Sequence, residues 1–340
     1  MATTTTTTIP LGTAGRSVLM VALVFFVFFV ISFITNILGP LIPDIITGFH
    51  VSLALAAVLP FAFFIAYGVM SIPAGFAVQR WGEKKLMVVA FLAATLGATG
   101  FAAFPGYGMA VTSLFVIGAG MAVLQVAINP LLRVAGGEEH FAFNSAFAQL
   151  IFGVASFISP LVYSAIVSHL GATGEDAGSL YGLLRGLADP ALPWASIYWL
   201  FAVICGACVV LIVLLRFPRV ERTEEESAGT LSMYRELLRE RSVWLYFLAI
   251  IAYVGCEQGT ADWMSPFLER YHQVDPHTGG ADAVAYFWGL MTLGCLLAVG
   301  IALGFAIGRR RRASVDSMPV IDASRPPAPD ADPALTGDRA

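Results

Sequence analysis

Eight runs of about twenty apolar residues constrain this chain more than any other feature of its sequence. A helix needs about that many to cross the hydrocarbon core of a bilayer. Hydrophobic residues make up 58% of the 340 and charged residues 12%, whereas soluble domains have about twice that charged fraction. The sequence therefore predicts an all-α protein in a lipid bilayer. The expected spans are Val18–Ile42, Leu53–Val78, Met87–Phe104, Met109–Leu132, Phe147–Ser168, Ala195–Leu215, Val243–Phe267 and Val284–Ile307.

Lysine and arginine residues gather on one side of these spans. If the N-terminus is cytoplasmic, all of the 19 except Arg185 and Arg270 lie on the cytoplasmic side. Cytoplasmic loops of membrane proteins are enriched in these two residue types. We therefore predict a multi-pass protein of the cell (inner) membrane with both termini in the cytoplasm. The basic residues are explained by this orientation, and none of them indicates nucleic-acid binding.

The charged segment 217–241 separates two groups of spans. Residues 17–216 hold the first six, and residues 242–308 hold the seventh and eighth. The separating segment is expected to be cytoplasmic and to end in an interfacial helix with one apolar face. The tails 1–16 and 309–340 have no periodic apolar pattern, so we expect them to be disordered.

Amide side chains lie inside several spans. Gln125 and Asn129 are four residues apart, so a helix would present both on one face. An unpaired amide costs several kcal/mol in hydrocarbon, and this face is therefore expected to meet protein or a water-filled cavity. Asn36 precedes Pro40 in span one, and Asn129 precedes Pro130 in span four. Paired interruptions in corresponding helices are typical of a transporter's binding site.

Two acidic side chains fall inside the predicted spans, both in span seven. Glu257 lies near the middle of that span, and Asp262 lies nearer its outer end. A carboxylate at mid-membrane costs at least ~2.5 kcal/mol on insertion scales, which makes it a functional candidate by default. We predict that both residues couple transport to an ion. A structural hydrogen bond to a neighbouring helix is the alternative.

Six spans, a cytoplasmic linker and further spans resemble the pattern of the major facilitator superfamily. The loop between spans two and three is similar to that superfamily's signature, G-x-L-A-D-R-x-G-R-K. The matching residues are Gly75, Arg80, Gly82 and Lys84. Gln79 stands where the signature has Asp, and Glu83 stands where it has Arg. The resemblance implies a major-facilitator-type helical bundle with a gating hinge at this loop.

Within that superfamily, the chain resembles the fucose/glucose–galactose group of sugar:proton symporters. The resemblance runs from about Ser17 to Gly300 and implies alternating access around a central polar cavity. It further implies a hexose or 6-deoxyhexose substrate, with a proton or sodium ion as the coupling ion. The group has acids where this chain has Gly39 and Gln125, and an Asn where it has Phe152. The residues that carry the resemblance are Asn129-Pro130, Ala148-Gln149, Pro73-Ala74-Gly75 and Tyr253-Val254-Gly255.

Amides both donate and accept hydrogen bonds, which suits sugar hydroxyls. The candidate binding amides are Asn36, Gln125, Asn129 and Gln149. Trp263 could stack on a pyranose ring or anchor its helix at the outer interface. Gln149 also belongs to a stripe in span five, which either lines a cavity or serves as helix-packing contact. The stripe comprises Ser145, Gln149, Phe152, Ser156, Ser159 and Tyr163.

The sequence gives no sign of an enzyme, a cofactor or a metal site. The five histidines are scattered, and no glycine-rich phosphate loop is present. Cys205 and Cys208 form a C-x-x-C pair without a second Cys or His pair nearby, so we expect them to pack helices.

Transporters of the resembling group have twelve spans, against eight here. We expect one of three situations: a truncated product whose tail 313–340 is foreign to the fold, a homo-oligomer that completes the cavity, or a non-transporting membrane sensor or partner subunit. An uncoupled sugar facilitator is a further alternative to a symporter.

Overall fold

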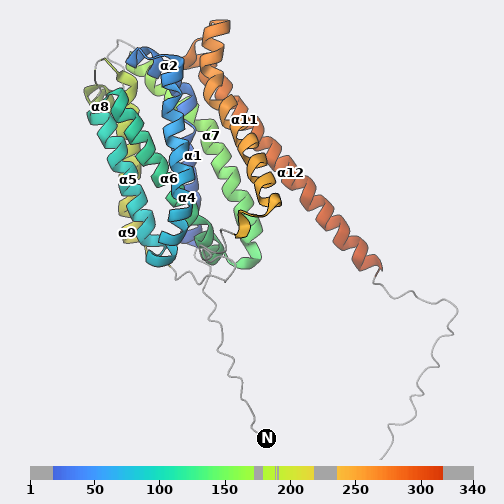
Figure 1. Cartoon of the computed structure of the whole chain (residues 1–340). Helices are drawn as coiled ribbons and strands as arrows, with labels where there is room; N and C mark the ends of the chain where they lie inside the picture. The colour runs from blue at the N-terminus through green and yellow to red at the C-terminus, as the bar shows by residue number, and fades with distance from the viewer. Residues whose placement is uncertain (1–17, 172–178, 188, 190, 218–235, 317–340) are drawn as a thin grey trace, which may run out of the picture. The chain divides into compact units, whose positions relative to one another are not determined.

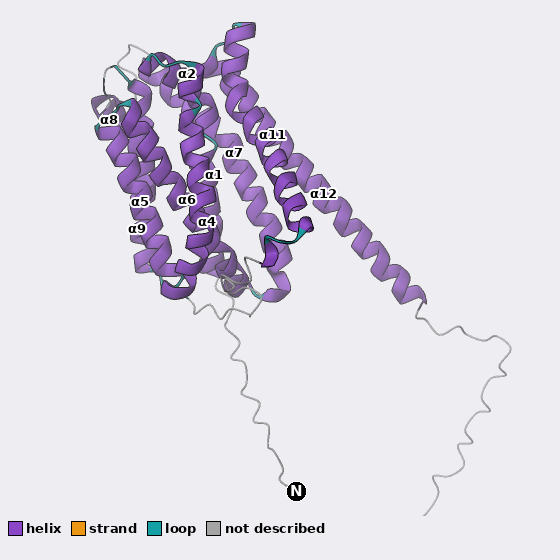
Figure 2. Cartoon of the chain, viewed as in Figure 1, coloured by secondary structure: helices purple, strands orange, loops and turns teal. Residues whose placement is uncertain are grey.

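A computed structural model describes residues 18–171, 179–187, 189, 191–217 and 236–316. This part of the chain is helical and contains no strand (Figure 2). Eight segments within it are long and apolar enough to cross a membrane, which confirms the prediction of an all-α protein with eight spans. The segments are Val18–Phe49, Leu53–Trp81, Glu83–Ala103, Tyr107–Gly136, Glu138–Leu170, Pro193–Leu214, Arg241–His272 and Pro276–Leu297.

The first span is broken into two helices, α1 (Val18–Thr35) and α2 (Leu38–Phe49). Pro40 has no N–H, and in a continuous helix its ring would clash with the carbonyl of Asn36, four residues earlier. The interruption that the sequence predicts at this point is therefore observed. Helix α2 continues beyond the predicted end at Ile42 and brings Asp44 into the span. We expected the acids inside the spans to be Glu257 and Asp262 of span seven alone. Asp44 in span one shows that this expectation was wrong.

The fourth span is a single helix, α6 (Tyr107–Gly136), which runs through Pro130. The expected pairing of interruptions in spans one and four was therefore wrong on the side of span four. Pro130 lies near the end of a long helix, where the loss of one backbone hydrogen bond leaves most of the ladder intact.

Six spans form one bundle around a common core, as Figure 1 shows. Helix α6 packs against α1, α4 and α5, while α5 packs against α9 and α1 against α7. Small residues allow these close approaches: a Cβ on Gly120 of α6 would lie 2.7 Å from the Ala90 carbonyl oxygen of α5. The remaining elements of this bundle are α3 (Leu53–Ala56), α4 (Val58–Trp81), α5 (Glu83–Ala103), η1 (Glu138–His140), α7 (Phe141–Gly171), α8 (Ser179–Leu187), η2 (Pro193–Ser196) and α9 (Ile197–Leu214).

Two long helices, α11 (Arg241–His272) and α12 (Ala281–Asp316), follow, joined by the short helix η4 (Pro276–Gly280). Helix α11 packs on α2, and η4 contacts α2 and α7. Two compact units make up the chain, Met1–Gly294 and Cys295–Ala340, and the second begins within α12. Helix α12 extends to Asp316, so residues 309–316 are helical where a disordered tail was predicted. The interfacial helix was expected around Leu231–Arg241, and its first part, 231–235, falls outside the described residues.

Candidate functional site

A buried carboxyl lies where α2 crosses α11. A Cβ on Gly39 would be 2.6 Å from the carbonyl oxygen of Ala261 and 3.3 Å from the Cα of Asp262, so the two backbones are in direct contact. Asp262 is 7% exposed and has no hydrogen bond or ion pair to any described residue. One turn further along α11, the buried hydroxyl of Ser265 also has no partner among them. The crossing thus places an unpaired acid beside the broken first span.

Glu257, the second predicted acid, lies one turn earlier on α11. It is half-buried and within hydrogen-bonding reach of Tyr253 on the same helix. Trp263 follows Asp262, is half-buried, and packs against the main core of the bundle. The two acids therefore differ in environment: Asp262 is enclosed by helices, and Glu257 is partly open.

Asn36 is buried in the interface between α1 and α7. Its Nδ2 donates to the Ser156 Oγ at 3.0 Å and to the Ser32 carbonyl oxygen at 3.0 Å, while its Oδ1 has no partner in the described part of the chain. Ser159 Oγ donates to the carbonyl oxygen of Phe33 at 2.7 Å. Ser156 and Ser159 of the span-five stripe thus make contacts between helices, as the helix-packing alternative predicts. Small polar residues often have this role where membrane helices pack together.

Gln125 and Asn129 share one face of α6, as their spacing predicts. Asn129 is exposed, and its Nδ2 donates to the Gln125 carbonyl oxygen at 3.0 Å. Gln125 is half-buried, and Gln149 is exposed on α7. Among the described residues, no hydrogen bond joins these three amides to Asn36 or to the acids of α11. The predicted residues therefore form separate groups: the amides of α6, the α1–α7 interface and the acids of α11.

The loop between α4 and α5 is tied to the end of the sixth span. Lys84 Nζ donates to the carbonyl oxygens of Val213 at 2.9 Å and Leu215 at 2.7 Å. Carbonyls at a helix C-terminus lack partners within the helix and attract cations. Gly82 has φ +81°, a conformation that favours glycine. Of the other predicted loop residues, Arg80 is exposed, and Gly75 is half-buried.

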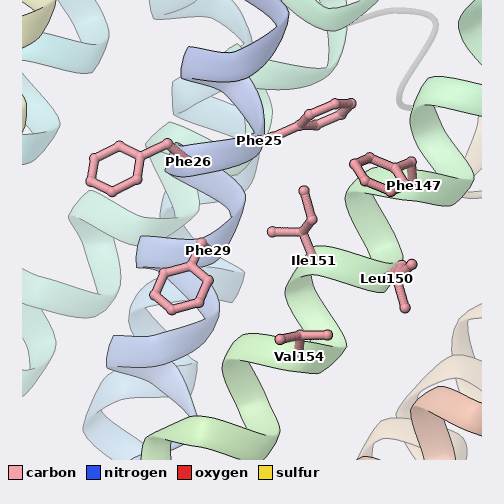
Figure 3. A pocket seen from close by; sticks show the side chains of 7 residues that line it. All are labelled: Phe25, Phe26, Phe29, Phe147, Leu150, Ile151 and Val154. Atoms are coloured by element: carbon pink, nitrogen blue, oxygen red, sulfur yellow. The ribbon is translucent and has the colours of Figure 1, made fainter.

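An open hollow of about 430 Å³ lies between α1 and α7 (Figure 3). Its lining side chains are all apolar and offer no partner for a sugar hydroxyl, so it is not the polar cavity that the resemblance implies. None of the predicted binding residues lines it. The lining residues are Phe25, Phe26, Phe29, Phe147, Leu150, Ile151 and Val154.

Sequence reasoning missed a polar cluster on α2, near the end of span one. The Tyr163 hydroxyl donates to Asp44 Oδ2, and His277 Nε2 lies 3.4 Å from Asp44 Oδ1. Asp44 could have been found by extending span one along its helical pattern to Phe49. The approach of His277 could not, because it depends on how the turn between α11 and α12 packs on the bundle.

The comparisons with known proteins point to one family. The family model described as Major Facilitator Superfamily matches residues 24–318. A glucose/galactose transporter of Brucella abortus is 28% identical over 270 residues, which cover 76% of this chain and 60% of that protein. The L-fucose-proton symporter of Escherichia coli is 27% identical over 241 residues, which cover 68% of this chain and 54% of that protein. The chain therefore spans less than two thirds of the length of these relatives.

Solved structures share the fold at lower sequence identity. The transporter FucP in its outward conformation has a TM-score of 0.60 and 23% identity, with 84% of this chain and 71% of that chain covered. A bacterial homolog of the human lysosomal transporter Spinster, in an inward-facing conformation, has a TM-score of 0.62 and 16% identity, with 86% and 62% covered.

Proposed function

The chain belongs to the Major Facilitator Superfamily, and from this membership we propose that it moves a hexose or 6-deoxyhexose across the cell membrane by alternating access, coupled to protons. The names of its relatives, a glucose/galactose transporter and an L-fucose-proton symporter, support this substrate class. The chain matches 60% or less of the length of those proteins. The transport activity of a full-length relative is therefore proposed for this chain and not assigned to it.

The observation that carries the proposal is the unpaired carboxyl of Asp262 at the crossing of α2 and α11. Ionisable groups inside a membrane are costly and typically mark ion pathways and proton relays. Asp262 lies against the broken first span, and interrupted helices are where transporters place substrate and ion sites. We assign Asp262 the binding of the coupling proton, with Glu257 as a second, more accessible carboxyl on the same helix.

The sugar would be held by amide side chains of the first, fourth and fifth spans. Gln125 and Asn129 present donors and acceptors on one face of α6, and Gln149 does so on α7. Asn36 contributes its unpartnered Oδ1, while its Nδ2 holds α1 to α7. Trp263 supplies a ring for stacking. The loop residues Gly75, Arg80, Gly82 and Lys84 would act in gating, with Lys84 as the tether to the sixth span.

Transport in proteoliposomes tests this proposal. With an inward proton gradient, the reconstituted chain should accumulate a labelled hexose or 6-deoxyhexose, and uptake should saturate. Asp262→Asn should lose accumulation but keep exchange of internal for external sugar, because only the coupling group is removed. Asp282→Asn, which changes an exposed acid at the start of α12, is the matched control and should accumulate sugar normally.

Each other outcome has a definite meaning. Accumulation that survives in Asp262→Asn would reject the coupling role of this residue. Accumulation driven by a sodium gradient alone would replace the proton by sodium. Saturable binding of the sugar without flux would reject transport by this chain in favour of a binding function.

A further inference from the structure

The cluster of Asp44, Tyr163 and His277 joins three elements that are distant in the sequence. Asp44 lies on α2, Tyr163 on α7 and His277 on η4, the turn between spans seven and eight. One carboxylate oxygen of Asp44 accepts from the Tyr163 hydroxyl, and the other lies 3.4 Å from His277 Nε2. A single carboxylate thus fastens this turn to the ends of spans one and five.

The backbone of η4 is fixed at the same place. Asp275 Oδ1 accepts from the backbone N–H groups of His277 at 2.7 Å and of Thr278 at 3.2 Å. Ser164 Oγ of α7 donates to the carbonyl oxygen of His277. These contacts fix the backbone of η4 at His277, from which the imidazole reaches Asp44.

The cluster lies at the opposite end of the spans from the loop at Gly82. Span one runs from Val18 to Phe49 and span two returns from Leu53 to Trp81, so Asp44 and Gly82 fall at opposite ends of the bundle. The side chains of Asp44 and His277 are 14% and 29% exposed. Both side chains are thus partly open at that end of the bundle.

We propose that Asp44, Tyr163 and His277 form a proton-sensitive latch that holds the turn between spans seven and eight against the ends of spans one and five. Histidine changes its charge between about pH 5 and 8. When protonated, His277 makes a charge-assisted contact with the Asp44 carboxylate, and such contacts are roughly twice as strong as neutral ones.

Glu269 of α11 and Asp275 add two further carboxyls near Asp44, so the protonated imidazole neutralises part of a negatively charged group of side chains. When His277 loses its proton, this attraction is lost, and only the Tyr163 hydroxyl and a neutral hydrogen bond hold Asp44. His277 Nδ1 is buried without a partner among the described residues, and opening of the latch would expose it to water.

Spin-label distances test the latch without substrate. Labels are placed on the exposed positions 54 and 278 as Ala54→Cys and Thr278→Cys, in the full chain with Cys256→Ser and Cys295→Ser to remove the two exposed thiols. At pH 5 we expect one short distance population, and at pH 8 a second, longer one. His277→Gln and Asp44→Asn should each show the longer population at both pH values.

His272→Gln is the matched control, since it removes an exposed histidine just before η4 and should leave the pH response intact. A distance distribution that does not change with pH in the unsubstituted cluster would overturn the latch, whatever the uptake assay shows. A pH response that is retained in His277→Gln would overturn it as well. Failure of sugar uptake with a normal pH response would reject the proposed function and leave the latch standing.

Discussion

Gly39 of α2 lies directly against the backbone of Asp262 on α11, at a distance where a Cβ would be 3.3 Å from the Asp262 Cα. The glycine therefore determines how close the seventh span comes to the broken first span. Because Asp262 is 7% exposed at this contact, the same close approach removes the carboxyl from solvent. The burial of the candidate coupling acid, Asp262, thus depends on a glycine, which has no side chain, at position 39 of another helix.

Gly39→Ala should separate α2 from α11. The added Cβ would lie 2.6 Å from the Ala261 carbonyl oxygen, which belongs to a helix backbone and cannot rotate away. We expect a loss of about 1–3 kcal/mol of stability, as for overpacked cores, and increased reactivity of a cysteine at Ser265 toward a water-soluble thiol reagent. Gly68→Ala is the control, because a Cβ there meets no atom within 4 Å. Equal thermal stability of the two variants would contradict the close approach.

Ser156→Ala and Asn36→Ala should be coupled energetically. The Asn36 Nδ2 to Ser156 Oγ hydrogen bond, at 3.0 Å, joins α1 to α7, and side-chain hydrogen bonds between membrane helices average ~0.6 kcal/mol in double-mutant cycles. A cycle on the free energy of unfolding should return about this coupling energy. The control cycle pairs Asn36→Ala with Thr112→Ala, because the Thr112 hydroxyl donates to the Gly108 carbonyl of its own helix. This cycle should give no coupling energy.

Lys84→Gln should loosen the end of the sixth span. The lysine donates to the carbonyls of Val213, in the last turn of α9, and of Leu215, its C-cap, and lies 5.8 Å from the centre of the Phe217 ring. Since the contact is partly exposed, we expect a cost of about 1 kcal/mol or less. The loosened helix end should show faster amide hydrogen exchange at residues 211–217. Lys85→Gln, at an exposed neighbouring position, should leave that exchange unchanged.

Glu257→Gln should abolish uphill accumulation of sugar and leave counterflow exchange intact. Glutamine keeps the size of the side chain but cannot release a proton. The comparison with Asp262→Asn then shows whether one or both carboxyls of α11 carry the coupling proton. A Glu257→Gln protein that still concentrates substrate would assign Glu257 a structural role through Tyr253.

The sequence determined the features that depend on local composition. Runs of apolar residues defined eight spans, since a bilayer accepts only helices of that length. Pro40 determined the break after Asn36, because a proline ring excludes the carbonyl four residues before it. The four-residue spacing of Gln125 and Asn129 placed them on one face of α6.

Only the tertiary structure decided which of these groups meet. Asn36 became a helix-packing contact because Ser156 of α7 lies within hydrogen-bonding distance, and Asp262 became enclosed because Gly39 admits the backbone of α11. The partnership of Asp44 with His277 spans more than 230 residues of chain. No periodic pattern encodes such a distance, because it results from the packing of helices whose order in the sequence does not determine their neighbours in space.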